Sequence, residues 1–259
     1  MNQAQKRLFL IKRLLDEDKR YRGMAVPADT NEQKRILRSL MNIRHPKAID
    51  VEFLTVQDEY LRQEIKAAGV TRLADLEPIS GDLYLWQGDI TRLQCGAIVN
   101  AANSGMTGCY APCHACIDNC IHTFAGIQLR LDCAKIMEQQ GHEEPTGQAK
   151  ITRAYNLPCD YVLHTVGPII QDSVTAEDEQ LLSSCYRACL ELAEQNGVES
   201  IAFCCISTGV FHFPNQRAAE IAVETVRRYK KETGSEMKAI FNVFKDLDFE
   251  IYRRLLTEN

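Results

Sequence analysis

The sequence predicts an α/β fold in which a mostly parallel sheet is covered by helices on both faces, with a helical extension in front of it. From Leu83 onward, short apolar segments of strand character alternate with longer segments of helical periodicity, and this alternation is typical of βαβ units. Residues 1 to about 78 show helical periodicity and no convincing strand. We therefore expect an extension over residues 1–80 and a main domain over residues 81–259.

The extension contains three segments in which apolar residues recur at helical spacing. These segments are Leu8–Leu15, Ile36–Ile43 and Phe53–Ile65. Asp29–Asn31 predicts the N-cap of the second helix, and Asp50 directly precedes the third. Pro27 and Pro46 separate the segments. Because apolar stripes need a partner surface, we expect the extension to pack on the main domain.

The main domain alternates strands with helices along its whole length. The expected strands are Leu83–Gln87, Ala97–Val99, Ala149–Thr152, Tyr161–Val166, Ser200–Cys205 and Lys238–Val243. The expected helices are Ala115–Gln140, Ala176–Asn196, Pro214–Glu232 and Asp246–Thr257. Pro214 suits a first helical position because its missing N–H would have no partner there.

The overall composition narrows the class of function. A net charge of −5 argues against nucleic acid as the main partner, which requires a surplus of basic residues. No apolar run approaches the ~20 residues of a membrane helix, and the charged start of the chain does not resemble a signal peptide. Eleven cysteines in such a chain are expected to be reduced thiols, which predicts a cytoplasmic protein.

The most informative segment lies between the strand at Ala97–Val99 and the helix that follows it. It holds the pair Asn100 and Asn103, then three soft ligands, then Asp118; the ligands are Cys109, His114 and Cys116. In an open α/β sheet, such a loop at the carboxyl end of a strand is where ligands bind. Zinc prefers these ligand types, and three of them leave a fourth position for water or substrate, as in catalytic sites.

Other cysteines and histidines in the chain have simpler explanations. Cys113 adjoins His114 and is the main alternative ligand, and the whole group also fits buried or redox-labile thiols. His122 lies among apolar helical residues and is expected to be packed in the core. The roles of His164, at the end of a strand, and of His212 stay open. His212 suits either a phosphate contact or the edge of a ribose pocket.

Two further strand–loop segments have a composition that suits ligand binding. Gly88–Thr91 follows a strand, and an acidic residue there can accept hydrogen bonds from a base or ribose, although taken alone this segment is better explained as an ordinary turn or helix cap. Ile206–Pro214 lies between a buried strand and a helix. Its backbone amides and the positive end of that helix suit a phosphate.

Six motifs follow one another along residues 83 to 257. They are Gly88–Thr91, Ala97–Asn103, Ile117–His122, Pro145–Ala149, His164–Pro168 and Ile206–Phe211. In this order they closely resemble the macrodomain, an ADP-ribose-binding module. The resemblance implies a three-layer α/β/α fold with a mixed, mostly parallel sheet, here preceded by the helical extension.

The site loop resembles one branch of the macrodomains more closely. The paired asparagines and the aspartate before Cys120 are similar to the MacroD-type ADP-ribosyl hydrolases, in which a run of glycines separates them. Here the longer loop Gly108–Cys116 replaces those glycines. That departure and the extension resemble microbial zinc-dependent macrodomains, often encoded beside a sirtuin-like ADP-ribosyltransferase and a lipoyl-carrier protein. Cys120 takes the place of a helix-buried cysteine in metal-free relatives, so we interpret it as core.

The resemblance implies a Zn²⁺-dependent hydrolase that removes mono-ADP-ribose from modified protein side chains. A lipoyl-carrier protein modified by a sirtuin-like transferase is one candidate substrate, and neither nucleic acid nor a membrane is expected as a partner. Asp89 would hold the adenine amino group, Ile90 the adenine-side backbone, and Phe244 the adenine face by stacking. The diphosphate would be held by the amides around Ser207, Thr208, Gly209, Val210 and Phe211.

The implied chemistry takes place at the distal ribose. Asn103 would orient this ribose, Phe213 would form one wall of its pocket, and Asp118 would orient or deprotonate the attacking water. Zinc would activate water, fix the ribose hydroxyls, or do both. Two alternatives remain from the sequence: a module that binds ADP-ribose without hydrolysing it, with a structural zinc, and a scaffold within a sirtuin–carrier complex.

Overall fold

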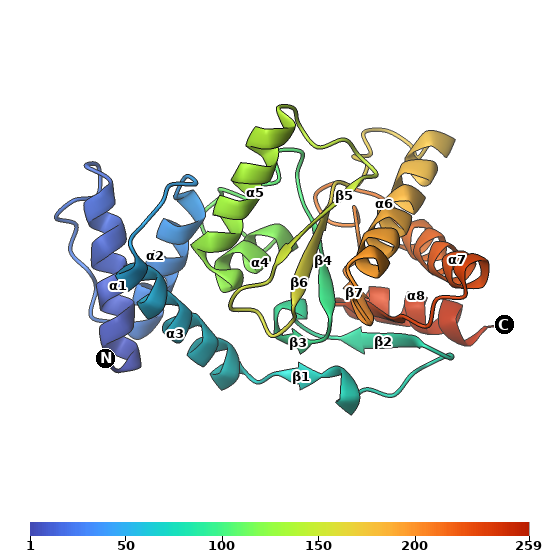
Figure 1. The fold of residues 1–259 in the computed structure, drawn as a ribbon, viewed down its shortest axis with the longest axis horizontal. Helices are drawn as coiled ribbons and strands as arrows, with labels where there is room; N and C mark the ends of the chain where they lie inside the picture. The colour runs from blue at the N-terminus through green and yellow to red at the C-terminus, as the bar shows by residue number, and fades with distance from the viewer. Residues whose placement is uncertain (259) are drawn as a thin grey trace.

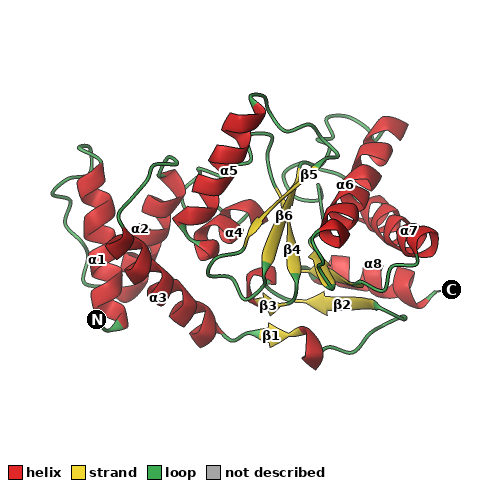
Figure 2. Cartoon of the chain, in the orientation of Figure 1, coloured by secondary structure: helices red, strands yellow, loops and turns green. Residues whose placement is uncertain are grey.

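The computed structural model describes residues 1–258 and shows a sheet between two layers of helices, with three further helices at one end (Figures 1 and 2). The six-stranded sheet has the order β2-β8-β7-β4-β6-β5. Every neighbouring pair is parallel except β5 and β6 at the edge. The predicted three-layer fold with a mixed, mostly parallel sheet is therefore confirmed.

The bounds of the elements follow the chain from the blue to the red end of Figure 1. The helices are α1 Gln3–Glu17, α2 Thr30–Ile43, α3 Val51–Ala68, α4 Ile117–Ala125, α5 Ile127–Gln140, α6 Ala176–Gln195, α7 Asn215–Thr233 and α8 Asp246–Thr257. The strands of the main sheet are β2 Leu83–Gln87, β4 Ala97–Ala101, β5 Ala149–Arg153, β6 Tyr161–Thr165, β7 Ser200–Phe203 and β8 Lys238–Val243. A separate two-stranded parallel sheet pairs β1 Thr71–Arg72 with β3 Leu93–Gln94.

Two of the three helices of the extension, α2 and α3, begin where the sequence predicts. The Asp29 carboxylate accepts a hydrogen bond from the Glu32 amide at the start of α2, and Asp50 accepts one from Phe53 at the start of α3. Such caps satisfy amides that have no partner within the helix. The apolar faces of α1, α2 and α3 form their own core, which also takes in Ile127 of α5. The extension therefore shares its core with the main domain.

Polar contacts join the same two parts of the chain. The fully buried Gln57 of α3 accepts from the Ile127 amide at 3.1 Å and donates to Gln128 at 2.6 Å. Asp58 accepts hydrogen bonds from Gln128 and Asn156, each at 2.8 Å. These contacts confirm that the extension packs on the main domain.

Several element boundaries differ from the predictions. The single helix expected over Ala115–Gln140 is two helices, because Gly126 has φ 99° and ψ 171° and breaks the helical path between α4 and α5. Only glycine adopts this backbone region readily. The strand expected to reach Cys205 ends at Phe203. Helix α7 begins at Asn215, so Pro214 is the residue just before the helix and not its first residue. The strands β1 and β3 are too short to be recognised from periodicity.

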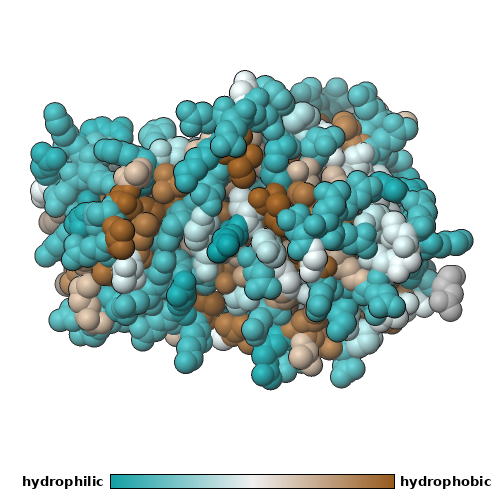
Figure 3. Space-filling model, in the orientation of Figure 1, coloured by the Kyte–Doolittle hydropathy of each residue, from teal (hydrophilic) through white to brown (hydrophobic). Residues whose placement is uncertain are grey.

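The surface shown in Figure 3 is mainly hydrophilic, with apolar side chains gathered in a few small patches. The large apolar side chains lie inside: one cluster fills the space between the sheet and its helices, and another fills the extension. Within residues 1–258, no helix is long and apolar enough to cross a bilayer.

We expect Gly126→Ala to lower the free energy of unfolding by about 2–4 kcal/mol, from backbone strain and lost polar contacts. A Cβ at Gly126 would lie 2.6 Å from Gln57 Nε2 and 2.8 Å from Gln128 Oε1. Gly141→Ala is the control, because Gly141 also has a positive φ of 74° but a Cβ there meets nothing within 4 Å. Urea unfolding measures both variants, and an equal loss would contradict the role given to the Gly126 contacts.

Candidate active site

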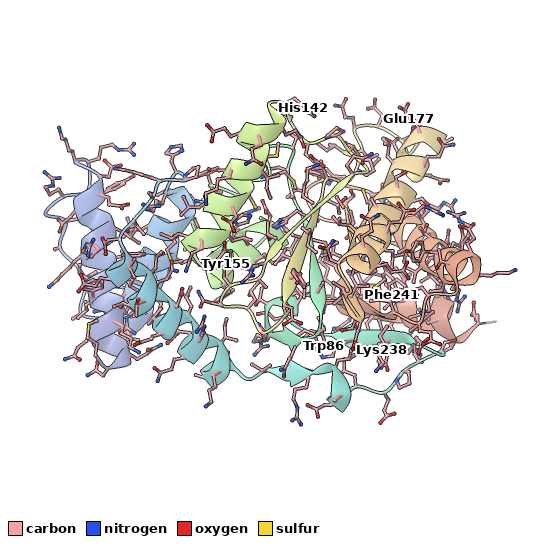
Figure 4. All side chains as sticks on the ribbon, in the orientation of Figure 1. Trp86, His142, Tyr155, Glu177, Lys238 and Phe241 are labelled. Atoms are coloured by element: carbon pink, nitrogen blue, oxygen red, sulfur yellow. The ribbon has the colours of Figure 1, made fainter. Side chains whose placement is uncertain are left out.

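The predicted site residues lie beyond the carboxyl ends of the parallel strands. Asp89 follows β2, Phe244 follows β8, the loop 204–214 follows β7, and Asn103 follows β4. Trp86 of β2 and Phe241 of β8, labelled in Figure 4, lie in the paired stretch just before two of these ends. Because parallel strands end at the same edge of the sheet, the fold brings these segments together.

A buried carboxylate lies at the centre of this edge. Asp118, in the first turn of α4, is 4% exposed. Its Oδ1 accepts a hydrogen bond from Asn100 Nδ2 at 2.8 Å, and its Oδ2 accepts one from Asn103 Nδ2 at 3.2 Å. The two asparagines therefore fix both oxygens of one carboxylate, which aligns the end of β4 with the start of α4.

The surroundings of Asp118 also set its basicity. Burial raises the pKa of Asp118 to about 6, against the opposing effect of Asn100, Arg130 and Asn103. His122, one turn further along α4, places its Nε2 3.5 Å from Asp118 Oδ1. Burial lowers the pKa of His122 well below its usual value, so this ring is neutral beside the carboxylate. His122 is 4% exposed, as predicted for a packed core histidine.

A second layer of buried polar groups orients Asn100. A carboxylate only accepts hydrogen bonds, so the Asn100 amide nitrogen must face Asp118. The same nitrogen lies 3.1 Å from His164 Nδ1, which therefore accepts, and His164 Nε2 then donates to Thr152 Oγ1 at 2.9 Å. Burial lowers the pKa of His164 to about 3. His164 is thus a neutral, fully buried residue of β6 that supports Asn100 from behind.

The three predicted metal ligands lie on the loop that leads into α4, where Cys116 precedes Asp118 by two residues. The ligand atoms of Cys109, His114 and Cys116 all lie within 4.8 Å of one another, and each residue is half-buried. Cys109 Sγ is 3.6 Å from His114 Nδ1. A tetrahedral zinc at about 2.3 Å from sulfur and 2.0–2.1 Å from nitrogen places neighbouring ligand atoms roughly 3.6 Å apart. The geometry therefore fits zinc.

Without a metal, the Cys116 sulfur is a neutral thiol. Burial, followed by the charges of Cys109 and Asp118, raises the pKa of Cys116 to about 12. A thiolate at such a place needs a neighbouring cation, and metal binding supplies one while releasing the proton. Cys116 Sγ also caps α4 by accepting from the Asn119 amide at 3.4 Å. The sulfur is therefore held at a fixed point of the helix.

The two competing thiols point elsewhere. Cys113 Sγ lies 3.2 Å from Ser39 Oγ and 3.4 Å from the Arg35 carbonyl oxygen, both in α2 of the extension. Cys120 Sγ accepts from Arg38 at 3.5 Å. Neither thiol is in the ligand group of Cys109. Cys120, expected in the core, is only half-buried because it faces the extension.

The adenine side of the predicted site has one polar and one aromatic group. Asp89 Oδ1 accepts hydrogen bonds from the amide and hydroxyl of Thr91, at 3.0 and 2.6 Å. Its other oxygen, Oδ2, lies 3.6 Å from Arg92 Nε. Ile90 is buried, whereas the Phe244 side chain is 76% exposed. The adjacent strands β2 and β8 thus present a carboxylate and an open aromatic face side by side.

The loop after β7 is shaped to present backbone amides. Among residues 1–258, the amides of Gly209, Val210 and Phe211 donate to no acceptor of the protein. Ser207 and His212 have φ of 64° and 59°, which turns the loop sharply at both ends. Successive free amides in such a turn, next to the N-terminus of α7, form a concave anion site.

The aromatic and histidine residues of this loop differ in exposure. Phe213 is 1% exposed and belongs to the main core, so its side chain offers a ligand little surface. Phe211 is half-buried and His212 is exposed. His212 is thus available at the rim of the anion site, although nothing in its contacts assigns it a role.

Sequence reasoning did not single out three residues that hold the site. Asn119, which is fully buried, donates to the Ala111 carbonyl at 2.9 Å, and Arg38 of α2 donates to Asn119. Arg130 of α5 lies over the Tyr110 ring at 4.4 Å. Only the motif Ile117–His122 gave a signal for Asn119. Arg38 and Arg130 meet the site loop through tertiary packing, which periodicity does not encode.

Comparison with known proteins gives consistent matches. A family model for the Macro domain matches residues 99–222. A protein of Treponema medium named protein-ADP-ribose hydrolase is 60% identical over 261 residues, covering 99% of this chain and 100% of its own length. A Staphylococcus aureus protein of the same name is 51% identical over 232 residues, with 89% and 87% coverage. The Trypanosoma brucei macrodomain in complex with ADP-ribose matches with a TM-score of 0.66 at 29% identity, covering 85% of this chain and 94% of that chain.

Proposed function

The chain belongs to the macrodomain family, and from that premise we propose that it is a zinc-dependent hydrolase that removes mono-ADP-ribose from modified protein side chains. Its relatives are named protein-ADP-ribose hydrolases, which supports the removal of ADP-ribose from proteins. The observation that carries the proposal is the position of Asp118. Its carboxylate is held by two asparagine amides, and it follows Cys116, the last of three convergent zinc-type ligands, by two residues at the start of α4.

The ADP-ribose would lie along the strand ends. Asp89 accepts a hydrogen bond from the adenine amino group, the backbone at Ile90 borders the base, and Phe244 stacks on its face. The diphosphate takes the free amides of Gly209, Val210 and Phe211 within the loop Ser207–Phe211, where the α7 dipole favours its charge. The Thr208 amide, also expected to hold the diphosphate, donates to the Cys205 carbonyl at 3.4 Å. These contacts fix the molecule so that its distal ribose reaches the end of β4 and the start of α4.

Cleavage breaks the bond between the anomeric carbon of the distal ribose and an oxygen or nitrogen of the protein side chain. Water adds to that carbon and gives up a proton, and the side chain leaves with the electron pair of the broken bond. A leaving carboxylate needs no proton, whereas a leaving nitrogen takes the proton that the water gave up. Asp118 is the group that accepts the proton or orients the water, because its oxygens are fixed and its raised pKa suits a general base near neutral pH. Asn103 orients the ribose while it holds Asp118.

Cys109, His114 and Cys116 would hold the zinc. When bound, it supplies a Lewis acid that lowers the pKa of water or stabilises negative charge on oxygen. Arg38 and Asn119 hold the three ligand residues in place through hydrogen bonds to the His114 and Cys109 carbonyls and to Cys116 Sγ. We also propose, on the resemblance to zinc-dependent macrodomains, that a lipoyl-carrier protein modified by a sirtuin-like transferase is a substrate.

We expect about one zinc per chain in the wild type and a sharp loss in Cys109→Ala and Cys116→Ala, because each removes one of three ligands. Cys113→Ala is the matched control and should keep its zinc, since its sulfur points to Ser39 and Arg35. Elemental analysis of the purified proteins measures this. Zinc retained in both ligand variants, or lost in Cys113→Ala, would overturn the ligand assignment.

We expect Asp118→Ala to release ADP-ribose from a mono-ADP-ribosylated protein about 10²–10⁴-fold more slowly, the usual contribution of a general base. Affinity for free ADP-ribose should change far less, because most contacts are with adenine and diphosphate. Stripping zinc should slow release in the same way, and readdition should restore it. Release assays and calorimetry together decide: a wild type that binds ADP-ribose but releases none is a binding module.

We expect Asp89→Ala to weaken ADP-ribose binding by about 1.5–3 kcal/mol, roughly 10- to 150-fold, through loss of one charge-assisted hydrogen bond. The control is Asp75→Ala, which removes an exposed carboxylate that is paired with Arg72 away from the site. Calorimetry with free ADP-ribose compares both variants with the wild type. Equal affinity in all three proteins would remove Asp89 from the site.

A further inference from the structure

The proposed zinc ligands lie on a segment without regular structure. Residues 102–116 form neither helix nor strand, although this loop must hold Cys109 and His114 at fixed positions. The hydrogen bonds within the loop are few, such as the His114 amide to the Ala111 carbonyl at 3.2 Å. A loop of this kind fixes a metal only if neighbouring elements hold its backbone.

One side chain of the extension reaches the backbone of a ligand residue. Arg38 Nη2, from α2, donates to the His114 carbonyl oxygen at 2.7 Å. The same guanidinium donates to Asn119 Oδ1 through Nη2 at 2.9 Å and Nε at 3.3 Å. Because the guanidinium is planar and rigid, it fixes the two acceptors relative to each other. Arg38 thus ties the ligand loop to α4.

Asn119 extends this tie to the other two ligand residues. Its amide nitrogen Nδ2 donates to the carbonyl oxygens of Cys109 at 3.3 Å and Ala111 at 2.9 Å, and its backbone amide donates to Cys116 Sγ. Its Oδ1 must accept from Arg38 for Nδ2 to face the loop. The orientation of this fully buried amide therefore depends on the arginine.

A second residue of α2 holds the middle of the loop. Asn42 Oδ1 accepts from the Cys113 amide at 2.9 Å, and Asn42 Nδ2 donates to Thr123 Oγ1 of α4 at 2.9 Å. Cys113 has φ 53°, so the loop turns sharply at this contact. Arg130 of α5 in turn donates to carbonyl oxygens at the end of α2, including that of Asn42 at 2.7 Å. The helix that holds the loop is itself held by the main domain.

We propose that Arg38 is a positioning residue, and that helix α2 of the extension, acting through Arg38 and Asn42, pre-forms the metal-binding loop. The inference rests on the proposed zinc site. It gives the extension a specific role in the reaction, beyond support for the fold. Without the arginine, Asn119 and the His114 carbonyl lose their common partner, and the Asn119 amide that binds the Cys109 carbonyl loses the contact that orients it. The loop then has to be ordered at the moment when the metal binds, which weakens binding.

The test compares three variants of the full chain: Arg38→Ala, Arg38→Lys and Gln57→Ala. Gln57→Ala is the matched control, because Gln57 is a buried residue of the extension that contacts Ile127 and Gln128 but not the loop. Zinc affinity is measured by competition with a chelator. We expect it to fall about 10–100-fold in Arg38→Ala, as for other residues that orient metal ligands. Arg38→Lys should recover only part of the zinc affinity, because an ammonium lacks the forked guanidinium that bonds both the His114 carbonyl and Asn119 Oδ1.

Gln57→Ala should lower thermal stability while leaving zinc affinity at the wild-type value. Equal loss of affinity in Gln57→Ala and Arg38→Ala would overturn the proposal, because the effect would then come from general loosening of the extension. Wild-type affinity in Arg38→Ala would overturn it as well.

Hydrogen exchange of the metal-free proteins separates this inference from the zinc site itself. Amides of residues 109–116 should exchange faster in Arg38→Ala than in the wild type, and Gln57→Ala should leave them unchanged. An unchanged rate of amide exchange in residues 109–116 of Arg38→Ala would contradict the positioning role of Arg38, whether or not zinc binds. A wild type that binds no zinc, with faster loop exchange in Arg38→Ala, would instead refute the proposed metal and keep Arg38 as the residue that orders the loop.

Discussion

The site depends on one buried carboxylate whose two oxygens are bound by two asparagines. Asn100 belongs to β4, Asn103 to the loop that follows, and Asp118 to α4. A buried charge is costly unless its hydrogen bonds are complete, so the sheet, loop and helix have to meet in one arrangement. Burial raises the pKa of Asp118 while the two amides oppose it. The contacts that stabilise the fold here are therefore the same contacts that set the basicity of the proposed base.

The extension and the main domain are one unit because polar groups of each satisfy the other. Arg130 of α5 donates to backbone carbonyls at the end of α2, and Arg38 of α2 donates to Asn119 of α4. Gln57 of α3 likewise accepts a hydrogen bond from the first backbone amide of α5. Helix termini leave such groups without partners inside the helix. Each part thus supplies hydrogen-bond partners for polar groups of the other, which a purely apolar contact would not do.

The sequence predicted the fold class, the succession of strands and helices along the chain, and the loop on which Cys109, His114 and Cys116 converge, because these depend on periodicity and local spacing. Cys109, His114 and Cys116 are close in sequence, so a single loop brings them together. The break at Gly126 was missed, because glycine within a helical pattern does not by itself predict a positive φ. Arg38 was missed for another reason: its partners are about 80 residues away, and no local pattern records such a contact.

The proposed ADP-ribose-binding groups and the proposed metal ligands lie on different kinds of structure, and this difference fits the proposed reaction. The groups that would bind ADP-ribose lie directly at the ends of rigid, paired strands, where β2 and β8 carry Asp89 and Phe244. The proposed metal ligands lie instead on an irregular loop whose position depends on side chains from a separate layer of helices. In the proposed reaction, binding and cleavage could then vary independently: changes in the loop and in α2 would alter cleavage, while the groups at the strand ends would still bind ADP-ribose.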